Sequence, residues 1–305
     1  MATGSPATAS RTIDAHVHLF SDAVRREPER FFARDAYFGE LYRPGKVRLA
    51  SADELIADMD VAGVDAAVAV GWGWRELDLC RQENDYLIEA AGRYPGRLAG
   101  LAAVAPLAGA AAARELERCL DCGLRGAGEL MPDGQGFALD DPAALAPIVE
   151  LLRARDGVLL THTSEPAGHR YPGKGSVTPG VVDRFLGQHP GLRVVLAHFG
   201  GGLPFYELMP EVRARAVAAV YDSAAAAYLY DWSVFRTVVE LAGAERVLFG
   251  TDYPLSRPER YLRAIRALGL PEDVLAAVLG GNAARVFRLG EAAVPAEAER
   301  GSIGV

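Results

Sequence analysis

The sequence has few cysteines, no long apolar run and no excess of positive charge, and each shortage excludes a class of protein. Three cysteines (Cys80, Cys119 and Cys122) are too few for a disulfide framework and are typical of a reducing compartment. No apolar run approaches the roughly 18 residues that span a bilayer, and the first eleven residues lack the apolar core of a secretion signal. We therefore expect a cytoplasmic protein that does not bind membranes.

The charge balance is also informative, because 32 Lys+Arg against 40 Asp+Glu give a net charge of −8. A chain with this balance has no electrostatic footprint for nucleic acid. It is 305 residues long and 50% hydrophobic, so it can bury a large core without disulfides or structural metals. The composition excludes disorder as the main state.

Short apolar runs alternate with segments of helical period along most of the chain. The runs are TIDAHVHL (12–19), DAAVAV (65–70), LAGLAAV (98–104), LRGAGEL (124–130), GVLLTHT (157–163), LRVVLAHF (192–199), VAAVYDS (217–223) and RVLFGTDY (246–253). Strand and helix in alternation predict a parallel sheet, and eight such units predict an α/β fold of the single-domain (β/α)8 TIM barrel type. An open doubly wound sheet is disfavoured because no glycine-rich phosphate turn follows the first strand.

The predicted boundaries are a disordered N-terminus (1–11), the barrel (12–289) and a C-terminal tail (290–305) that is mobile or used in subunit contact. A long insertion, rich in Arg and aromatic residues, follows the first strand at 20–50. Long connections in compact domains often cover active sites, so we expect the insertion to do so here.

Four of the six histidines lie at or near the ends of predicted strands. His16 and His18 are two residues apart on the first strand, so both side chains leave the same face. His162 and His198 follow the fifth and sixth apolar runs, and Asp252 follows the last. Each histidine taken alone could be an ordinary polar residue, but together they predict a divalent metal site at the C-terminal mouth of the barrel. Imidazole and carboxylate ligands without thiolates suit zinc, and less selectively manganese, iron or cobalt.

At these residues the sequence resembles the metal-dependent amidohydrolase superfamily, in particular its amidohydrolase 2 branch. This branch contains hydrolases and nonoxidative decarboxylases related to aminocarboxymuconate-semialdehyde decarboxylase. The resemblance rests on DAHVHLF, LLTHTSEP, VLAHFGGGLPF, FGTDYP and GNAARVF, which occur in the family's order over nearly the whole chain. It implies that His16, His18, His162 and Asp252 bind metal and that His198 is a catalytic or second-metal histidine.

Glu129 ends the fourth apolar run, where two-metal relatives place a bridging carboxylated lysine or a glutamate. Without a lysine in that segment no carbamate bridge can form. Glu129 could therefore bind a second metal, orient a ligand histidine or contact the substrate. The branch usually works with one metal, so we expect one ion, most simply zinc.

Residues near the predicted mouth are candidates for substrate binding. The loop after the fifth strand (164–177) carries polar and cationic groups, and two tryptophans follow the second strand. The candidates are Glu165, His169, Arg170, Tyr171, Lys174, Trp72 and Trp74. Solvated loop charge and plain packing are the alternatives.

The leading functional hypothesis is a metal-dependent hydrolase that attacks a lactone, an amide or a related carbonyl with metal-activated water. Asp252 would accept the water proton, and His198 would polarise the carbonyl or protonate the leaving group. The alternative is a nonoxidative decarboxylase of a small carboxylic acid, in which Arg170 or Lys174 would help to hold the anion. A barrel that binds without catalysing is a third reading. In each case the partner is a small molecule, which could be anionic, and the chain could form a homodimer.

Overall fold

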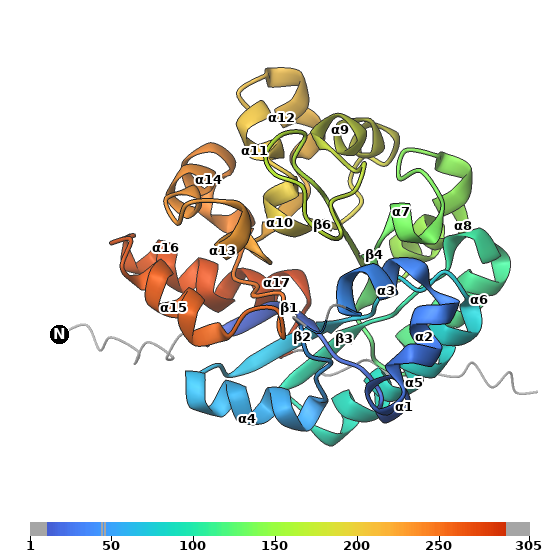
Figure 1. The fold of residues 1–305 in the computed structure, drawn as a ribbon. Helices are drawn as coiled ribbons and strands as arrows, with labels where there is room; N and C mark the ends of the chain where they lie inside the picture. The colour runs from blue at the N-terminus through green and yellow to red at the C-terminus, as the bar shows by residue number, and fades with distance from the viewer. Residues whose placement is uncertain (1–10, 44, 46, 291–305) are drawn as a thin grey trace, which may run out of the picture.

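Eight short parallel strands form the centre of the computed structural model, which describes residues 11–43, 45 and 47–290 (Figure 1). The strands are β1 (Ile13–His18), β2 (Ala66–Val70), β3 (Leu98–Leu101), β4 (Gly126–Leu130), β5 (Val158–Thr161), β6 (Val194–Leu196), β7 (Ala219–Asp222) and β8 (Val247–Leu248). Nearly every strand residue is buried, which explains why the strands read as continuous apolar runs in the sequence.

Backbone pairing closes these strands into a barrel. Parallel ladders join β1-β2-β3 and β4-β5-β6-β7-β8 in chain order. A parallel bridge between Ala102 and Ala127 links the first ladder to the second, and another between Val17 and Tyr253 links β1 to the segment after β8. The predicted TIM barrel is therefore confirmed.

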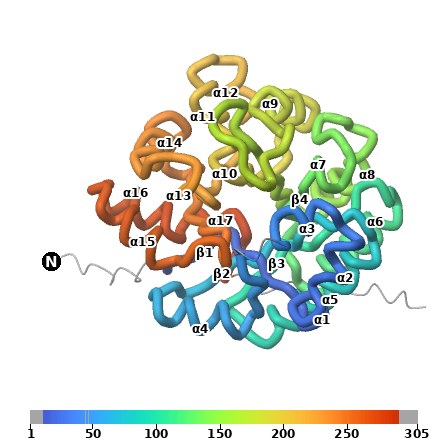
Figure 2. The backbone as a smooth tube through the Cα atoms, in the orientation of Figure 1, coloured from blue at the N-terminus to red at the C-terminus, as the bar shows by residue number. Residues whose placement is uncertain are grey.

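Helices surround the barrel in the order of the chain, as the colour sequence of the tube in Figure 2 shows. The outer helices are α4 (Ala52–Ala62), α5 (Leu77–Arg93), α6 (Ala110–Asp121), α8 (Pro142–Ala154), α9 (Pro179–Gln188), α12 (Pro210–Ala216), α14 (Val234–Ala242) and α15 (Pro258–Arg266). Shorter segments are α1 (Asp22–Arg26), α2 (Pro28–Arg34), α3 (Ala36–Tyr42), α7 (Pro132–Gln135), α10 (Ala197–Gly200), α11 (Leu203–Tyr206), α13 (Ala226–Leu229), α16 (Glu272–Ala276), α17 (Asn282–Val286), η1 (Pro106–Ala108), η2 (Ala244–Arg246) and η3 (Ala277–Gly281). Among the described residues, no helix combines the length and the apolarity needed to cross a bilayer.

Local sequence signals fix where these helices begin and end, as α4 illustrates. Ser51 and Glu54 form a capping box at its start, in which each side chain accepts a hydrogen bond from the other's backbone N–H. Gly63 ends the helix in the left-handed conformation, with φ of 72°. Ser51 and Glu54 thus mark the end of the insertion and the start of the first barrel helix, and Gly63 marks the end of that helix.

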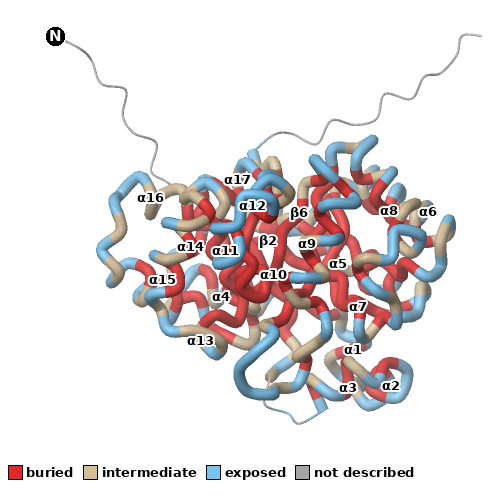
Figure 3. The backbone as a smooth tube through the Cα atoms, turned by 90° about the horizontal axis from the view of Figure 1, so that it is seen from above, coloured by how far each residue is buried: buried red, intermediate tan, exposed pale blue. Residues whose placement is uncertain are grey.

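The buried residues lie mainly in the centre of the molecule, with exposed segments at the rim (Figure 3). One apolar cluster joins alternate strand residues, among them Ala66, Val68 and Val70, to Phe287 after α17. A larger cluster lies between strands and outer helices. This packing makes the strand ends a fixed platform for side chains.

The insertion after β1 forms three short helices, α1 to α3, rather than an irregular loop. Its aromatic residues pack on the segment after β2: Phe38 lies 5.3 Å from Trp72 and 4.6 Å from Trp74, measured between ring centroids. Together with Phe20 and Tyr42 they form a satellite core beside the barrel. The predicted long insertion is thus confirmed. The predicted terminal segments fall almost wholly on 1–10 and 291–305, outside the described residues, and the domain boundaries stay a prediction.

Candidate metal centre

Polar side chains gather where the barrel strands end. His16 and His18 come from β1, Glu129 from β4 and Asp222 from β7. His162 directly follows β5, while His198 and Asp252 lie in the turns shortly after β6 and β8. Parallel strands of a barrel present their carboxyl ends at one mouth, so residues far apart in the sequence meet there. Six of them, all but Asp222, form two groups of three side chains that could hold a metal ion, and the carboxylate of Glu129 joins the two groups.

The first group contains His16, His18 and Asp252. The Nε2 atoms of His16 and His18 lie 3.3 Å apart, and His18 Nε2 lies 3.4 Å from Asp252 Oδ1. His16 is fully buried, whereas the Asp252 side chain retains 15% of its exposure. This group therefore reaches from the barrel interior toward solvent.

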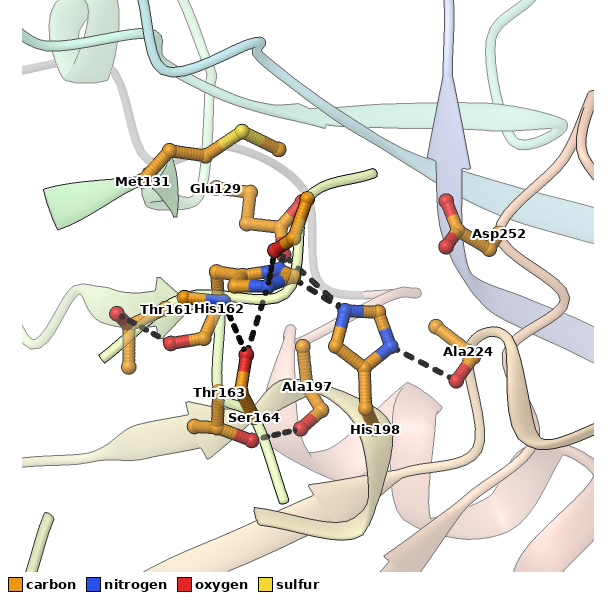
Figure 4. A network of polar contacts seen from close by, with 12 residues as sticks. Glu129, Met131, Thr161, His162, Thr163, Ser164, Ala197, His198, Ala224 and Asp252 are labelled. Carbon is orange, nitrogen blue, oxygen red and sulfur yellow. Dashed lines mark hydrogen bonds and ion pairs between the residues drawn. The ribbon is translucent and has the colours of Figure 1, made fainter. Parts of the chain in front are cut away.

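The second group contains Glu129, His162 and His198, which point toward one another in Figure 4. His198 Nε2 lies 3.0 Å from His162 Nδ1, and His162 Nδ1 lies 3.1 Å from Glu129 Oε1. Asp252 lies across the site from them in the same view. His162 was expected to share an ion with the β1 histidines, whereas in the structure it lies nearer to His198.

Glu129 joins the two groups, because each of its oxygens faces a pair of histidines. Oε2 lies 3.4 Å from His16 Nε2 and 3.2 Å from His18 Nε2, while Oε1 faces the second group. Burial opposes its charge, but His16 and the other imidazoles hold the pKa of Glu129 well below its usual range. Burial likewise opposes charge on His16, yet Asp222 and Glu129 raise the pKa of its imidazole well above the usual value. The site is thus a buried, charge-compensated cluster.

Hydrogen bonds outside the cluster determine which histidine nitrogens face its centre. His16 Nδ1 lies 2.9 Å from Asp222 Oδ2, His162 Nε2 lies 3.0 Å from Gly173 O, and His198 Nδ1 lies 2.8 Å from Ala224 O. Carboxylate and carbonyl oxygens only accept, so each of these nitrogens donates. The opposite nitrogen of a neutral His16 or His198 ring then directs a lone pair inward. His162 Nδ1 also faces a carboxylate oxygen, Glu129 Oε1, so it donates there unless a cation takes the place of its hydrogen.

This donor set fits a divalent cation. In the neutral rings, His162 Nδ1 and His198 Nε2 would direct lone pairs at each other across 3.0 Å, which requires a proton or a cation between them. Neighbouring ligands of an ion with bonds of about 2.0–2.2 Å lie about 3.0–3.6 Å apart, and the separations in the cluster match this range. Burial of so many imidazoles and carboxylates without a metal would be costly.

Two of these residues have unusual backbone conformations. His198 and Asp252 adopt positive φ values of 58° and 60° although neither is glycine. Such conformations are uncommon and concentrate at functional sites, where the surrounding structure holds them. Both residues sit at the turn that leaves a strand, which directs their side chains across the mouth.

A cavity of about 450 Å³ opens above the cluster. His18, Glu129, His162, His198 and Asp252 line it on one side. Its other walls are largely aromatic and aliphatic, contributed by Leu41, Tyr42, Val47, Trp72, Met131, Tyr171, Pro172, Tyr228, Leu229 and Leu255. An apolar pocket with a few converging polar groups is the usual form of a small-molecule site.

The residues predicted to bind substrate lie in different places. Trp72, His169 and Tyr171 line the cavity, whereas Glu165 and Lys174 line an adjoining pocket of about 360 Å³. Lys174 Nζ donates to carbonyl oxygens of its own loop, at Ala167 and His169. Trp74 is buried in the satellite core and Arg170 is exposed. A substrate role for these seven residues stays a prediction.

Sequence reasoning missed two residues at the site. Asp222 closes the seventh apolar run in the same way as the predicted ligands close theirs, so its position was a usable signal. Tyr42 lies within the insertion, where no periodicity points to the cavity. Burial, together with the charges of Asp252 and Glu129, raises the pKa of Tyr42 well above its usual range, so its hydroxyl remains protonated as a donor.

Comparison with known proteins shows which family and which enzymes the chain is similar to. A family model described as amidohydrolase matches residues 13–289. The chain is 26% identical over 291 residues to gamma-resorcylate decarboxylase of Polaromonas sp. (strain JS666 / ATCC BAA-500), covering 78% of this chain and 87% of that protein. It is 28% identical over 243 residues to 2-amino-3-carboxymuconate-6-semialdehyde decarboxylase of Dictyostelium discoideum, covering 68% of this chain and 66% of that protein.

Several solved structures with the same fold are of decarboxylases. That of 5-carboxyvanillate decarboxylase from Sphingomonas paucimobilis superposes with a TM-score of 0.76 at 23% identity, covering 92% of this chain and 100% of that one. That of dihydroxybenzoic acid decarboxylase from Polaromonas sp. JS666 contains bound manganese; its TM-score is 0.72 at 20% identity, covering 93% of this chain and 98% of that one. At these identities the structures show the fold alone.

These comparisons correct the leading functional hypothesis. A hydrolase was expected, but the relatives that match along most of the chain are decarboxylases, so that expectation is wrong and the findings favour the alternative. The expectation of a divalent metal agrees with the histidine and carboxylate cluster, while zinc as the particular ion is not confirmed. A homodimer and a cytoplasmic location stay predictions.

Proposed function

We propose that this chain, which belongs to the amidohydrolase family, is a divalent-metal-dependent nonoxidative decarboxylase of a small aromatic carboxylic acid. One observation carries the proposal: His18 and Asp252 of the first group and all three members of the second line one side of a cavity whose other walls are mainly aromatic and aliphatic. Such a site can bind a flat, apolar ring and present its carboxylate to a cation. Gamma-resorcylate, 5-carboxyvanillate and dihydroxybenzoic acid, the acids in the names of three of the relatives above, are compounds of this kind.

We assign the metal to His16, His18 and Asp252, with Glu129 Oε2 as a fourth donor. These atoms are 3.2 to 3.4 Å from their neighbours. His162 lies beyond Glu129 and contacts its other oxygen, so it could join the same ion after a small shift or hold a second one with His198. Counting ions per chain decides between these arrangements.

A divalent cation held by these residues would supply positive charge for the substrate carboxylate. Decarboxylation breaks the bond between the ring carbon and the carboxylate carbon, releases CO₂, and leaves the ring carbon in need of a proton. His198 lines the cavity, and its Nδ1–H is held by Ala224 O, so its Nε2 can carry that proton. Asp252 also lines the cavity, and its side chain is the most exposed of the assigned ligands.

Aromatic residues orient the ring. Trp72 lies on the wall beside the β1 histidines, with its ring centroid 5.9 Å from that of His18. Tyr42 packs edge-on against Trp72 at 5.4 Å and keeps a protonated hydroxyl near Asp252 and Glu129. Together they can hold a ring by its faces and donate to an oxygen substituent.

The proposal is tested by incubating the metal-reconstituted protein with hydroxylated and methylated benzoic acids, including 2,6-dihydroxybenzoate and 6-methylsalicylate. We expect release of one CO₂ per molecule of phenolic product, both measured in the same reaction. Chelated protein and the His198→Asn variant are the controls. Hydrolysis products, or the absence of CO₂ from every acid with a fully loaded site, would contradict the proposal.

A further inference from the structure

Asp222 is a buried carboxylate at the end of β7 whose two oxygens accept three hydrogen bonds. Oδ1 accepts from the backbone N–H groups of His198 (3.2 Å) and Ala224 (2.9 Å). Oδ2 lies 2.9 Å from Nδ1 of His16. One side chain therefore contacts a member of each histidine group.

These contacts determine where the hydrogen of His16 resides. An ionised carboxylate has no hydrogen to donate, so the short contact requires that Nδ1 of His16 carries one. In the neutral ring Nε2 is then unprotonated, and it lies 3.3 Å from His18 Nε2 and 3.4 Å from Glu129 Oε2. Only this tautomer directs a lone pair to the place where a metal would bind.

We propose that Asp222 is a positioning residue: it selects the tautomer and fixes the ring of His16 for metal binding, and it holds the backbone that carries His198. The inference rests on the proposed function, because it takes His16 to be a metal ligand. His162 and His198 are fixed by backbone carbonyls instead, at Gly173 and Ala224. A backbone carbonyl cannot be removed by a side-chain substitution. Substituting Asp222 therefore tests how much the hydrogen bond to a histidine nitrogen contributes to metal binding.

Replacement by asparagine gives a sharp expectation because the two ends of the amide differ. If the amide oxygen keeps the two backbone N–H groups, the NH₂ group faces Nδ1 of His16. Nδ1 must then accept, and the ring hydrogen moves to Nε2, where it blocks the metal. If the amide turns over, its NH₂ group faces two N–H donors, which is costly in a buried site. Either arrangement opposes metal binding.

Asp14→Asn is the matched control. Asp14 is equally buried and also accepts three hydrogen bonds, from the backbone N–H groups of Thr251 (3.0 Å) and His16 (3.2 Å) and from the Thr251 hydroxyl (2.6 Å). Asp14 lies on β1, two strands from β7, and its substitution also replaces a buried carboxyl group, but it touches no imidazole nitrogen. The pair separates control of the tautomer from loss of a buried carboxylate.

The experiment measures Mn²⁺ and Zn²⁺ affinity by calorimetric titration of metal-free wild type, Asp222→Asn and Asp14→Asn, together with the melting temperature of each metal-free protein. We expect Asp222→Asn to lose about 10- to 100-fold or more in affinity, the range typical of residues that support a ligand histidine. Asp14→Asn should lose less than about threefold. A residue that only stabilises the fold would lower the melting temperature and leave the affinity of folded protein unchanged.

Equal affinity losses in both variants, or none in Asp222→Asn, would overturn the inference. If Asp222→Asn does not fold, the ¹⁵N-edited histidine spectrum of metal-loaded wild type gives the answer: we expect His16 protonated at Nδ1, and an unprotonated Nδ1 refutes the role. Wild type that binds neither ion would overturn this inference together with the proposed metal centre. If Asp222→Asn loses affinity but wild type releases no CO₂ from any aromatic acid, the inference stands and the proposed function fails.

Discussion

The two histidine groups of the site differ in what holds them. In the first, with His16, His18 and Asp252, the ring of His16 is held by the side chain of Asp222 within the barrel. The second, with Glu129, His162 and His198, is supported by backbone carbonyls of the segments that follow β5 and β7. The ring of His16 thus depends on a buried strand side chain, whereas the rings of His162 and His198 depend on carbonyls of loops that also shape the cavity.

From this difference we infer that the first group binds metal and that the second transfers the proton. Rigid strands suit metal binding, because small changes in donor position weaken a metal site. Loops that contact substrate suit proton transfer, because their position can respond to the ligand. Gly173 O, which accepts from His162, also accepts from the Tyr37 hydroxyl of α3 at 2.9 Å, so the insertion is linked directly to the second group.

The largest expected effect comes from removing His198. Since His198→Asn takes away the proposed proton carrier but none of the first group, turnover should fall about 10²- to 10⁴-fold, the usual contribution of a positioned acid or base. Metal affinity of the first group should stay within a few-fold of wild type. Steady-state rates and metal titration on the same preparation check both; a variant that has lost its metal would place His198 among the ligands.

Glu129→Gln should affect both groups at once, because the carboxylate contacts all four histidines. Loss of its charge leaves buried imidazoles without compensation and removes a donor oxygen, so metal affinity should fall on the order of 100-fold. Metal titration measures the affinity, and elemental analysis gives the number of ions per chain. One ion in both wild type and variant would show that Glu129 bridges no second metal.

Acidity should affect metal binding and metal-free stability in opposite directions. Burial opposes charge on His16 and His162, but Glu129, with Asp222 at His16, raises the pKa of both above the usual 6.5. A metal must displace these protons, so affinity should rise by up to about tenfold per pH unit per proton above pH 6.

The metal-free fold behaves the other way. Stability from a raised histidine pKa is fully present below about 6.5 and is lost as pH rises through the folded-state value. Metal-free melting temperature should therefore decrease from pH 6 to 9 while metal affinity increases. Parallel changes in the two quantities would contradict the charge assignment at His16 and His162.

The smallest effect is expected from Tyr37→Phe, which removes one hydrogen bond to Gly173 O. A neutral hydrogen bond contributes about 0.5–1.5 kcal/mol, so turnover should fall roughly 2- to 12-fold. Metal affinity of the first group should not change, since no contact of that group involves Gly173. A larger loss of metal than of turnover would mean that the two groups are not independently supported.

Much of this site could be predicted from the sequence because barrel geometry converts strand ends into neighbours. His16, His18, His162, His198 and Asp252 each end an apolar run, and the structure brings them to one mouth. Their division into two groups was not predictable, since it depends on side-chain direction at each turn. Asp222 gave the same signal but was missed, because its run was read only as a strand.

The loops were less predictable for a physical reason. Trp72 and Trp74 were both substrate candidates, with plain packing as the alternative. Because β2 ends at Val70, the two-residue period of a strand does not extend to them, and of the two only Trp72 lines the cavity. Lys174 was a candidate for holding an anion, yet its ammonium is occupied by carbonyls of its own loop. Charge in a loop does not reveal its hydrogen-bond partners.

The choice between hydrolysis and decarboxylation was also outside the reach of the residues alone. Both reactions can use a cation held by histidines and carboxylates and a nearby proton carrier. In hydrolysis water attacks a carbonyl carbon, whereas in decarboxylation a substrate carbon takes up a proton as CO₂ leaves. The ligand set is compatible with either reaction. The decarboxylase relatives supply that distinction.

The most direct test of the account is CO₂ release by the metal-loaded protein from 2,6-dihydroxybenzoate and related benzoic acids, set against the same protein after chelation. The account predicts stoichiometric CO₂ and decarboxylated ring product that disappear on chelation and return when Mn²⁺ or Zn²⁺ is restored. CO₂ release that persists in metal-free protein, or its absence from a fully metallated site with every acid in the series, would contradict it.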